Sequence, residues 1–464
     1  MEELLGTSGL EDRFVEGRVR AWVQGAGREP SAREQLRIQR QSRRALRCTL
    51  ARQWTEKEYR RFARRLAESS LLQRFCLLDR IDVVRVPSKS ALQRYEAMAD
   101  EEEIRRMAGE LNRLASSMPE GGRQPLGLAE AAGAEMVWAD STCLKANIHF
   151  PVDWVLLRDA VRTLMKAVIL IRRQGLKHRM EEPAEFMKRM NRLSMQMTQA
   201  GRRSGSVRSR KKILRSMKRL TGIVRRHAER YRRVLSVDWR QTEWTQRQAE
   251  QVLSRIDGVL AVLPSAIRQA HERIIGRRIV PNEAKVLSLY EPELRVIVRG
   301  KAGAEVEFGN TLYLAEQRHG LIVDWKLLRE GAPGDAKLLE ESLERMQEIF
   351  GSYPLGVGAD RGFDRRKTRE YLAEREIYNG LCPKSPKDLR HRLQDEVFAD
   401  VQRRRAQTEG RIGILQNDFF GHPLRNKGFE SRERAVAWAV LGHNLWVLAR
   451  LPQAEETKRR KRAA

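Results

Sequence analysis

The sequence has few of the features that indicate a secreted, membrane-spanning or cysteine-rich protein. Its 464 residues include only four cysteines, Cys48, Cys76, Cys143 and Cys382, which lie far apart and form no CxxC pair. That spacing argues against a disulfide framework and against a zinc site built from cysteines. No run of about 18 apolar residues occurs, and the chain begins MEELLGTSGLEDRF, with acids rather than a charged and then apolar leader. We therefore expect a protein of the reducing cytoplasm with no membrane partner.

Several common catalytic motifs are also missing. The eight histidines show no HExxH or other paired metal spacing, and HERII (271–275) has no second histidine, so we expect them to be structural or surface residues. The glycine-rich GKAGAEVEFG (300–309) lacks the GxxxxGK[ST] pattern, which argues against ATP-driven chemistry. Ser141 is not in a GxSxG elbow, and a turn role is the simpler expectation for it.

Basic residues are abundant. The chain has 90 Lys and Arg against 61 Asp and Glu, a formal charge of +29, and 41% of its residues are hydrophobic. The length suggests two to four domains, and the hydrophobic content is sufficient for folded cores. So large a positive charge favours an anionic partner, with a scattered basic surface as the alternative.

The first 130 residues are charged and helical in pattern. Apolar residues recur at helical spacing in segments such as 57–78, and no strand pattern stands out. Residues 86–111 read as two helices joined at Asp100, which is compatible with a helix-turn-helix that places Ser88, Lys89 and Gln93 toward DNA. Two ordinary packed helices are an equally good interpretation.

The pattern changes after residue 130. EMVWADSTCLKANIHFP (135–151) predicts a strand pair, and residues 152–279 are helical again. Within that block, residues 201–233 contain 14 Lys and Arg and one acid, Glu229. Such a stretch must be solvated or bound to a polyanion, and we favour the polyanion.

The remaining third alternates between strands and helices. Strand patterns at 284–328 are followed by a helix at 335–350, a strand ending in PLGVGAD (354–360), a helix near 364–376 and a short strand at 378–382. Long helices are predicted at 394–418 and 431–451, before a basic tail. Trp438 and Trp446 on the last helix are expected to be core residues.

Three carboxylates stand out in this pattern. MVWAD and LGVGAD place Asp140 and Asp360 at the ends of strands, where ligand sites form in open α/β sheets. In QRRRAQTEGRIGILQ (402–416), helical spacing puts Glu409 on one face with Arg405, Gln402 and Gln416. A solvent-exposed Arg405–Glu409 ion pair is the alternative for that helix taken by itself.

These motifs resemble the DDE transposases of prokaryotic insertion sequences. The resemblance covers most of residues 135–451 and rests on ADSTCLKANIHFPVDWVLLRDAVRTL (139–164), GVGADRGFDRRKTREYL (356–372) and RAQTEGRIGILQNDFFG (405–421), followed by GHNLWVLARL (442–451). It implies a multidomain α+β protein: a helical DNA-binding region (1–130), a ribonuclease H-like α/β catalytic domain (131–451) with a large helical insertion (about 152–279), and a basic tail (452–464). It also implies that Asp140, Asp360 and Glu409 are the catalytic, metal-binding triad.

The sequence departs from the family at two positions. Many relatives have a tyrosine seven residues before the glutamate, an arginine four before it and a lysine seven after it, whereas this chain has Gln402, Arg405 and Gln416. We expect Arg405 and Gln416 to hold phosphate, and Lys384 to contact DNA or to be an ordinary loop lysine. Further DNA contacts are expected from Arg202, Arg203, Lys211 and Lys212 in the basic stretch.

The resemblance implies metal-dependent cleavage at the ends of an insertion sequence and strand transfer into target DNA. Three carboxylates suit two Mg²⁺ or Mn²⁺ ions per active site, because hard divalent cations prefer oxygen ligands and keep room for substrate phosphate. The expected partners are the element ends and the target DNA, bound by a homodimer near the prokaryotic nucleoid. A metal-dependent nuclease without strand transfer, and a non-catalytic DNA-binding protein derived from a transposase, remain as alternatives.

Overall fold

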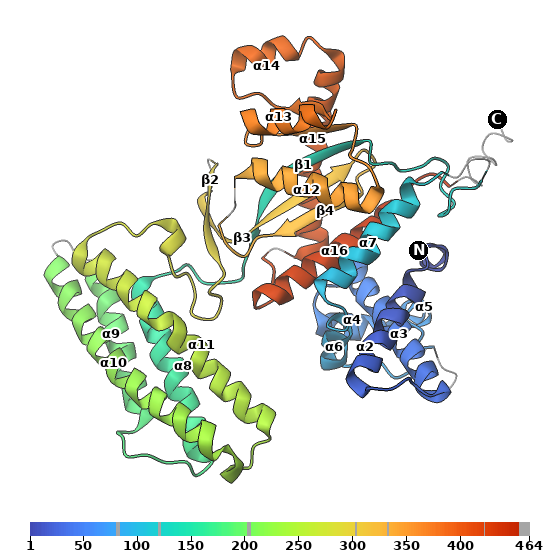
Figure 1. The fold of residues 1–464 in the computed structure, drawn as a ribbon. Coiled ribbons are helices and arrows are strands. Elements are labelled where there is room, and N and C mark those ends of the chain that lie inside the picture. The colour runs from blue at the N-terminus through green and yellow to red at the C-terminus, as the bar shows by residue number, and fades with distance from the viewer. Residues whose placement is uncertain are drawn as a thin grey trace. The chain divides into compact units, whose positions relative to one another are not determined.

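The chain forms two compact units. The first comprises residues Met1–Lys145 and Thr311–Ala464, and the second comprises Ala146–Asn310. The computed structural model describes residues 1–79, 84–118, 122–201, 206–301, 304–331, 334–421 and 423–453 (Figure 1). Arg202, Arg203 and residues 454–464 of the predicted basic tail lie outside the described residues. Among the residues that are described, no helix is both long and apolar enough to cross a membrane.

The central element is a mixed sheet of six strands. They are β1 (Met136–Lys145), β2 (Arg295–Lys301), β3 (Ala304–Gln317), β4 (Ile322–Leu327), β5 (Gly356–Ala359) and β6 (Tyr378–Leu381). The hydrogen-bonded order is β2-β3-β1-β5-β6, and β4 pairs with β3 beside this path. β5 is parallel to both β1 and β6, whereas β2 and β4 are antiparallel to β3. β3 passes from the second unit into the first, since Asn310 and Thr311 lie within it.

Thirteen helical segments in the described part of the first unit surround this sheet or form the N-terminal region. They are α1 (Glu2–Thr7), α2 (Leu10–Ala26), α3 (Ala32–Thr55), α4 (Tyr59–Glu68), α5 (Ser70–Phe75), α6 (Lys89–Glu96), α7 (Glu101–Ser116), α12 (Asp335–Phe350), α13 (Arg366–Glu374), α14 (Pro386–Arg392), α15 (Glu396–Ile414), the π-helix η4 (Leu415–Phe420) and α16 (Phe429–Leu448). From Ala435 to Leu445 helix α16 is buried on all sides and largely apolar, and the helix packs against α3, α7, β4 and η4 (Figure 1). The N-terminal helices and the sheet therefore share one hydrophobic core.

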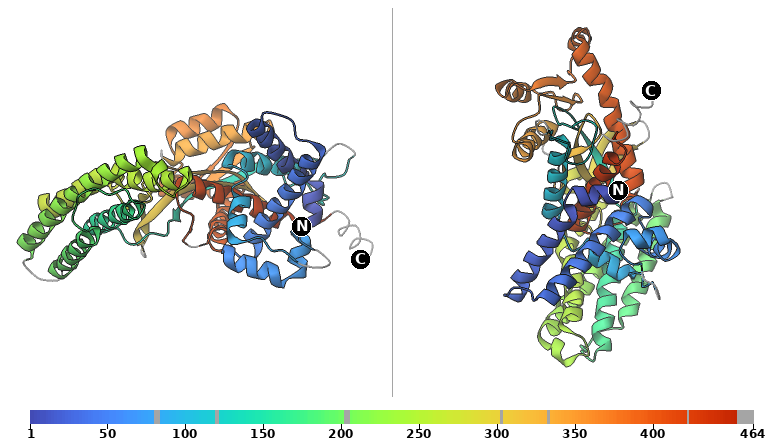
Figure 2. Two further views of the ribbon diagram at one scale, coloured as in Figure 1. Left: turned by 90° about the horizontal axis from the view of Figure 1, so that it is seen from below. Right: turned by 90° about the vertical axis from the view of Figure 1, so that its right-hand side faces the viewer.

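The second unit has a hydrophobic core of its own. It consists of α8 (Asp153–Arg173), α9 (Pro183–Gly201), α10 (Val207–Asp238) and α11 (Gln246–Ala270), with the short segments η1 (Trp239–Gln241), η2 (His271–Gly276) and η3 (Asn282–Ala284), and with β2 and the start of β3. α8 packs against α9, α10 and α11, and Figure 2 shows the four helices running alongside one another. Buried residues on α10, from Leu214 to Leu235, recur every three or four positions, as a core-facing helix requires.

The coarse fold prediction is confirmed: the chain is a multidomain α+β protein with a helical part and an α/β part. The predicted strand pair at 135–151 is wrong, because β1 is one continuous strand to Lys145. Asp140 therefore lies within β1 and not at its end. The strand continues because β3 is hydrogen-bonded to it, whereas the β1–β5 pairs end at Ala139. Strand structure also begins at Arg295 rather than at 284.

A buried amide network joins three distant parts of the first unit. Asn444 of α16 accepts a hydrogen bond from Ile322 N (2.9 Å) and donates to Ile322 O (2.8 Å). Asn112 of α7 donates to the same carbonyl (2.9 Å) and accepts from the Asn444 amide (3.1 Å). Both asparagines are almost wholly buried. They satisfy polar groups of β4 that would otherwise lie unpaired in the core.

Replacing Asn444 by alanine would leave Ile322 N–H without its acceptor inside the core. We expect the free energy of unfolding to fall by roughly 2–3 kcal/mol, because a buried polar group without a partner carries its full desolvation cost. Chemical denaturation followed by tryptophan fluorescence measures this change. Asn191→Ala, at an exposed position of α9, is the control and should change stability by less than about 0.5 kcal/mol. An equally small effect for Asn444→Ala would contradict the role given to this network.

Candidate active site

Strand register places the two aspartates beside each other. Ala139 of β1 pairs with Ala359 of β5, which in turn pairs with Leu381 of β6. Because all three strands are parallel, the next residue of each, including Asp140 and Asp360, lies at one edge of this part of the sheet. These aspartates are 220 positions apart in the chain. Parallel pairing alone brings them together.

Backbone hydrogen bonds hold both carboxylates in place. Asp140 Oδ1 accepts from Ser141 N at 2.7 Å, and Asp360 Oδ1 accepts from Gly362 N at 2.8 Å. The second contact forms a turn in which an aspartate side chain caps the chain two residues later. Ser141, predicted to lie in a turn, is within β1. The turn role belongs to Asp360.

Glu409 completes the group from helix α15. Burial raises the pKa of Asp140 to about 6; the hydrogen bond from Ser141 N lowers it, and the charges of Asp360 and Glu409 raise it further. Arg405 opposes this effect. The four side chains named by the sequence motifs are therefore close enough to interact electrostatically. Burial therefore makes Asp140 costly to ionise.

Two glycines allow α15 to approach the sheet closely. A Cβ atom on Gly358 of β5 would lie 2.8 Å from Val401 Cγ1, and one on Gly380 of β6 would lie 2.6 Å from the same atom. Real Cβ atoms do not tolerate such distances, so only glycine fits at these positions. Trp138 of β1 also donates from Nε1 to Val401 O (2.9 Å). Val401 is thus the point at which the Glu409 helix rests on the sheet.

A buried glutamate fixes the next turns of the same helix. Glu316 of β3 accepts from Thr408 Oγ1 (2.8 Å), forms an ion pair with Arg404 (2.9 Å) and contacts Arg411 (3.2 Å). The Glu316 side chain is only 2% exposed, so its charge is balanced by the two arginines rather than by water. Thr408 immediately precedes Glu409. The position of Glu409 is therefore set by contacts on the opposite face of its helix.

The two glutamines that depart from the family pattern bind the sheet. Gln402 Nε2 donates to Gly380 O at 2.6 Å, and Gln416 Nε2 donates to Thr142 Oγ1 at 3.1 Å and to Cys143 O at 3.4 Å. These contacts anchor α15 near its middle, at Gln402, and the following π-helix η4, at Gln416. Gln416 was expected to hold phosphate, but its amide N–H groups are directed to β1 in this arrangement.

Arg405 and Glu409 form the exposed ion pair that the sequence left as an alternative. The two groups are 3.7 Å apart, and the Glu409 side chain is 67% exposed. In the described part of the chain, no group of three acidic, histidine or cysteine side chains is arranged to hold a metal ion. The chemistry of the donors nevertheless suits a hard divalent cation, because all three are carboxylates and their mutual repulsion raises the Asp140 pKa.

Sequence reasoning missed a fourth carboxylate, Asp335. It lies in the first turn of α12, where Oδ1 accepts from Ser141 Oγ at 3.3 Å. Burial and the charge of Asp360 raise its pKa, and a Cβ atom on Gly362 would lie 2.7 Å from Asp335 Oδ2 and 3.0 Å from Asp360 Oδ1. Both carboxylates therefore face the same small volume. The available signal was an acid in the first turn of a predicted helix, which is too common to single out a site.

The predicted phosphate-binding lysines lie in two places. Lys384 is exposed in the loop after β6, three residues beyond Leu381, on the same side of the strand ends as Asp360. Lys211 and Lys212 lie on α10 in the second unit, Lys212 being exposed and Lys211 half-buried. Arg202 and Arg203 are outside the described residues.

Helix α10 carries a continuous basic stripe on its exposed face. We define this stripe as seven exposed cations, at spacings of three, four or seven residues: Arg208, Lys212, Arg215, Arg219, Arg226, Arg230 and Arg233. None of the seven forms an ion pair within the described residues, whereas neighbouring Arg225 and Arg232 are paired with Glu229 and Asp257. At 1.5 Å per residue the stripe is about 38 Å long. That is close to one turn of duplex DNA, about 34–36 Å.

The raised pKa of Asp140 makes stability depend on pH. Its folded pKa of about 6 exceeds the unfolded value near 3.9, so the stabilising protonation is complete below about pH 4 and is lost as pH rises through 6. In EDTA, Asp140→Asn should therefore stabilise the protein by roughly 1–3 kcal/mol more at pH 8 than at pH 4. Paired denaturation curves across this range measure the difference. Asp400→Asn, an exposed carboxylate on α15, should show none, and a flat result for Asp140→Asn would contradict the cluster.

No family model, curated protein or solved structure matches this chain. A functional proposal must therefore rest on the residues and their arrangement. Asp335 and Asp360 face one small volume, the charges of Asp360, Glu409 and Arg405 act on Asp140 beside it, and a separate unit carries a basic stripe without ion pairs among the described residues.

Proposed function

We propose that the chain is a DNA transposase of the DDE class, which cuts DNA at the ends of an insertion sequence and joins those ends to target DNA. One observation carries this proposal: Asp140 and Asp360 lie on adjacent parallel strands, and the Glu409 helix packs against both strands. A ribonuclease H-like catalytic domain requires that arrangement of its three carboxylates. The sequence motifs at the same three positions support the same conclusion.

The strand order supports a ribonuclease H-like domain as well. β1, which carries the first aspartate, lies between β3 and β5. An antiparallel β3–β4 pair is on one side of it, and the parallel strands β5 and β6 are on the other. The helical second unit enters the chain directly after β1, between the first and second catalytic aspartates. It corresponds to the large insertion that the spacing of the motifs demands.

Asp140, Asp360 and Glu409 would hold divalent metal, with Asp335 close enough to serve as an additional carboxylate. Two Mg²⁺ or Mn²⁺ ions bound there would activate an attacking oxygen and stabilise the leaving oxygen of an in-line displacement at phosphorus. Asp140 must be ionised to hold metal, and its pKa in the metal-free protein is about 6, so metal binding should weaken as the pH falls below that value. Arg405, one helical turn before Glu409, is placed to neutralise the phosphate under attack.

The same displacement serves both steps of transposition. In cleavage, a water oxygen bonds to phosphorus, the bond from phosphorus to the 3′ oxygen breaks, and the departing oxygen takes a proton. In joining, the freed 3′-hydroxyl replaces water as the nucleophile and the target strand supplies the leaving oxygen. Both ends of the element must be joined to the same target DNA. We therefore propose that a homodimer acts on the paired ends.

The basic stripe of α10 supplies a binding surface for the DNA that this chemistry requires. None of its seven cations forms an ion pair among the described residues. A phosphate backbone can therefore bind each of them without breaking an existing ion pair. Lys212 belongs to the stripe, and Lys211 lies beside it. Such contacts position DNA and carry no sequence information.

Strand transfer tests the catalytic proposal directly. With labelled ends taken from the DNA flanking the gene, in Mg²⁺ or Mn²⁺, we expect Asp140→Ala, Asp360→Ala and Glu409→Ala each to reduce joined product by more than about 100-fold, because even outer-shell metal partners typically contribute 10–100-fold. DNA binding should persist in all three. Asp400→Ala, an exposed carboxylate of the same helix, should leave joining unchanged.

The other outcomes identify the alternatives. Cleavage without joining would indicate a metal-dependent nuclease. Binding without any metal-dependent product would indicate a non-catalytic DNA-binding protein, which the exposed Arg405–Glu409 pair favours over the nuclease. Equal activity in the three triad variants and the wild type would place the chemistry elsewhere.

The stripe has its own test in the salt dependence of DNA binding. Replacing Arg215, Arg219, Arg226 and Arg230 by glutamine should reduce the slope of log affinity against log salt by roughly 3–4, because each phosphate contact contributes about 0.9. The control replaces four exposed arginines of α9 and α11, namely Arg192, Arg247, Arg255 and Arg268. Equal slopes for the two variants would contradict the assignment of this surface.

A further inference from the structure

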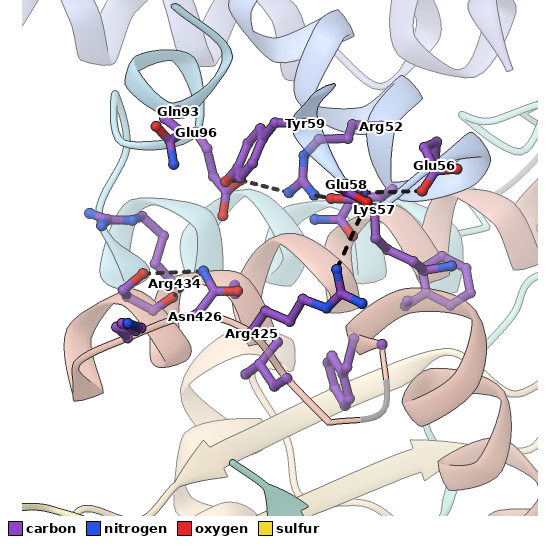
Figure 3. Close-up of a pocket in the computed structure, with 18 of the residues that line it drawn as sticks. Arg52, Glu56, Lys57, Glu58, Tyr59, Gln93, Glu96, Arg425, Asn426 and Arg434 are labelled. Atoms are coloured by element: carbon purple, nitrogen blue, oxygen red, sulfur yellow. Dashed lines mark hydrogen bonds and ion pairs between the residues drawn. The ribbon is translucent and has the colours of Figure 1, made fainter. Parts of the chain in front are cut away.

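A large cavity lies in the first unit, apart from the carboxylate cluster. Its volume is about 960 Å³, and it is lined by residues from the end of α3 to the start of α4, by α6, and by the segment from η4 to the start of α16. Figure 3 shows Gln93 and Glu96 on one side of it and Arg425, Asn426 and Arg434 on the other. One wall therefore comes from the N-terminal helices, and the other from the chain that follows the Glu409 helix.

The lining is strongly basic, with eight Lys and Arg and three Glu. Two of the three glutamates form ion pairs within the wall, whereas Glu56 accepts a hydrogen bond from Glu58 N (3.2 Å) and has no ion pair among the described residues. Glu96 forms an ion pair with Arg52 (2.6 Å), accepts from Tyr59 Oη and is held by Trp438 Nε1 at its backbone carbonyl (3.0 Å). Glu58 pairs with Arg61 (3.2 Å) and lies 3.9 Å from Arg425. Among the described lining residues, Glu56 is the one acid left to balance the remaining cations.

Five of the lining cations have no ion pair within the described residues: Lys57, which directly precedes Glu58 and α4, and Arg60, Lys89, Lys427 and Arg434, on which the argument rests. These last four come from three separate segments, namely α4, α6 and the chain from 427 to 434. Lys57 is half-buried beside them, and burial lowers its pKa although Asp418 partly offsets the effect. An anion in the cavity would therefore meet charges from several sides.

The volume of the cavity and its buried apolar residues restrict the kind of anion that can bind there. Its volume is at the upper end of the range of about 300–1,000 Å³ that is typical of sites for drug-sized ligands, and a single phosphate would leave most of it empty. Phe419, Phe420 and Leu424 line the cavity but are almost wholly buried. They do not offer exposed rings on which bases could stack. Recognition here must depend mainly on charge.

At the rim of the cavity, one face of α6 carries side chains that suit binding to a nucleic-acid strand. Ser88 caps this helix by accepting a hydrogen bond from Ala91 N (3.3 Å). Lys89 and Gln93 are both exposed and lie one turn apart on the same face of the helix. Both side chains line the cavity. A lysine for phosphate and an amide for a base edge are a common combination in DNA-binding helices.

We propose that this cavity, formed by α3, α4, α6 and the 419–435 segment, binds a stretch of DNA backbone through Arg60, Lys89, Lys427 and Arg434. The choice of DNA rather than another polyanion rests on the proposed transposase function. The contact is a second DNA-binding surface, separate from the stripe on α10. Because the chain that follows the Glu409 helix forms one wall, DNA bound here contacts a segment continuous with the catalytic helix.

The test uses the full chain in EDTA, so that no cleavage is required. Lysine acetylation followed by mass spectrometry should show that duplex DNA protects Lys57, Lys89 and Lys427, while Lys188, an exposed lysine of α9 that does not line the cavity, stays reactive. In parallel, the variant with Arg60→Gln, Lys89→Gln, Lys427→Gln and Arg434→Gln should bind duplex DNA about tenfold or more weakly and lose roughly 3–4 from the salt slope.

A matched variant controls for charge. Arg20, Arg33, Arg37 and Arg40 are exposed cations of α2 and α3 that do not line the cavity, and their replacement by glutamine should change the slope far less. Identical slopes for the two variants, or unprotected cavity lysines in a DNA complex, would overturn the proposal. Equal protection by inorganic phosphate at the same phosphate concentration would also overturn it, in favour of a small-anion site. If DNA protects the cavity lysines but the protein shows no strand transfer, the transposase function is refuted and the DNA-binding cavity is not.

Discussion

The parallel pairing of β1 with β5 is the constraint on which the candidate site depends. Four residue pairs, from Met136 with Gly356 to Ala139 with Ala359, connect segments more than 200 positions apart. The pairing requires small residues, because Cβ atoms on Gly356 and Gly358 would lie within 2.4 and 2.7 Å of Met136 and Trp138. It sets the two aspartates beside each other and creates the surface on which α15 rests. Glu409 then reaches the cluster only because Glu316 and Val401 fix the orientation of that helix.

Charge is distributed unevenly over this basic chain. Carboxylates gather beside the end of β5, where burial and the charges of neighbouring carboxylates raise the pKa values of Asp140 and Asp335. Cations without acidic partners gather instead on α10 and around the cavity of the first unit. A phosphate backbone relieves the second imbalance and a divalent cation relieves the first. The proposed function, with metal at the carboxylates and DNA at the cations, would neutralise both groups of charges.

Local patterns were sufficient to predict most elements but not the roles of side chains. The helix at 335–350 has the predicted bounds because its apolar period and its flanking glycines, Gly334 and Gly351, are local signals. The length of β1 was mispredicted because its continuation to Lys145 depends on β3, about 170 positions away. Gln416 looked like a phosphate ligand and is instead held by Thr142 and Cys143. Asp335 was missed because only the fold brings it to Ser141. Partners distant in sequence decide these cases, and periodicity carries no information about them.

The position of the second unit in the chain also determines the order in which the protein can assemble during synthesis. β1 leaves the ribosome before residues 146–310, yet its strand neighbours β3 and β5 begin only at Ala304, near the end of that segment, and at Gly356, after it. The helices of the inserted unit make local contacts and have their own core, so they can fold at once. Until then β1 is an unpaired, largely apolar segment. Such segments can pair with the wrong strand or with another chain. The insertion thus imposes a delay in which the strand that carries Asp140 is exposed to chaperones and to other nascent chains.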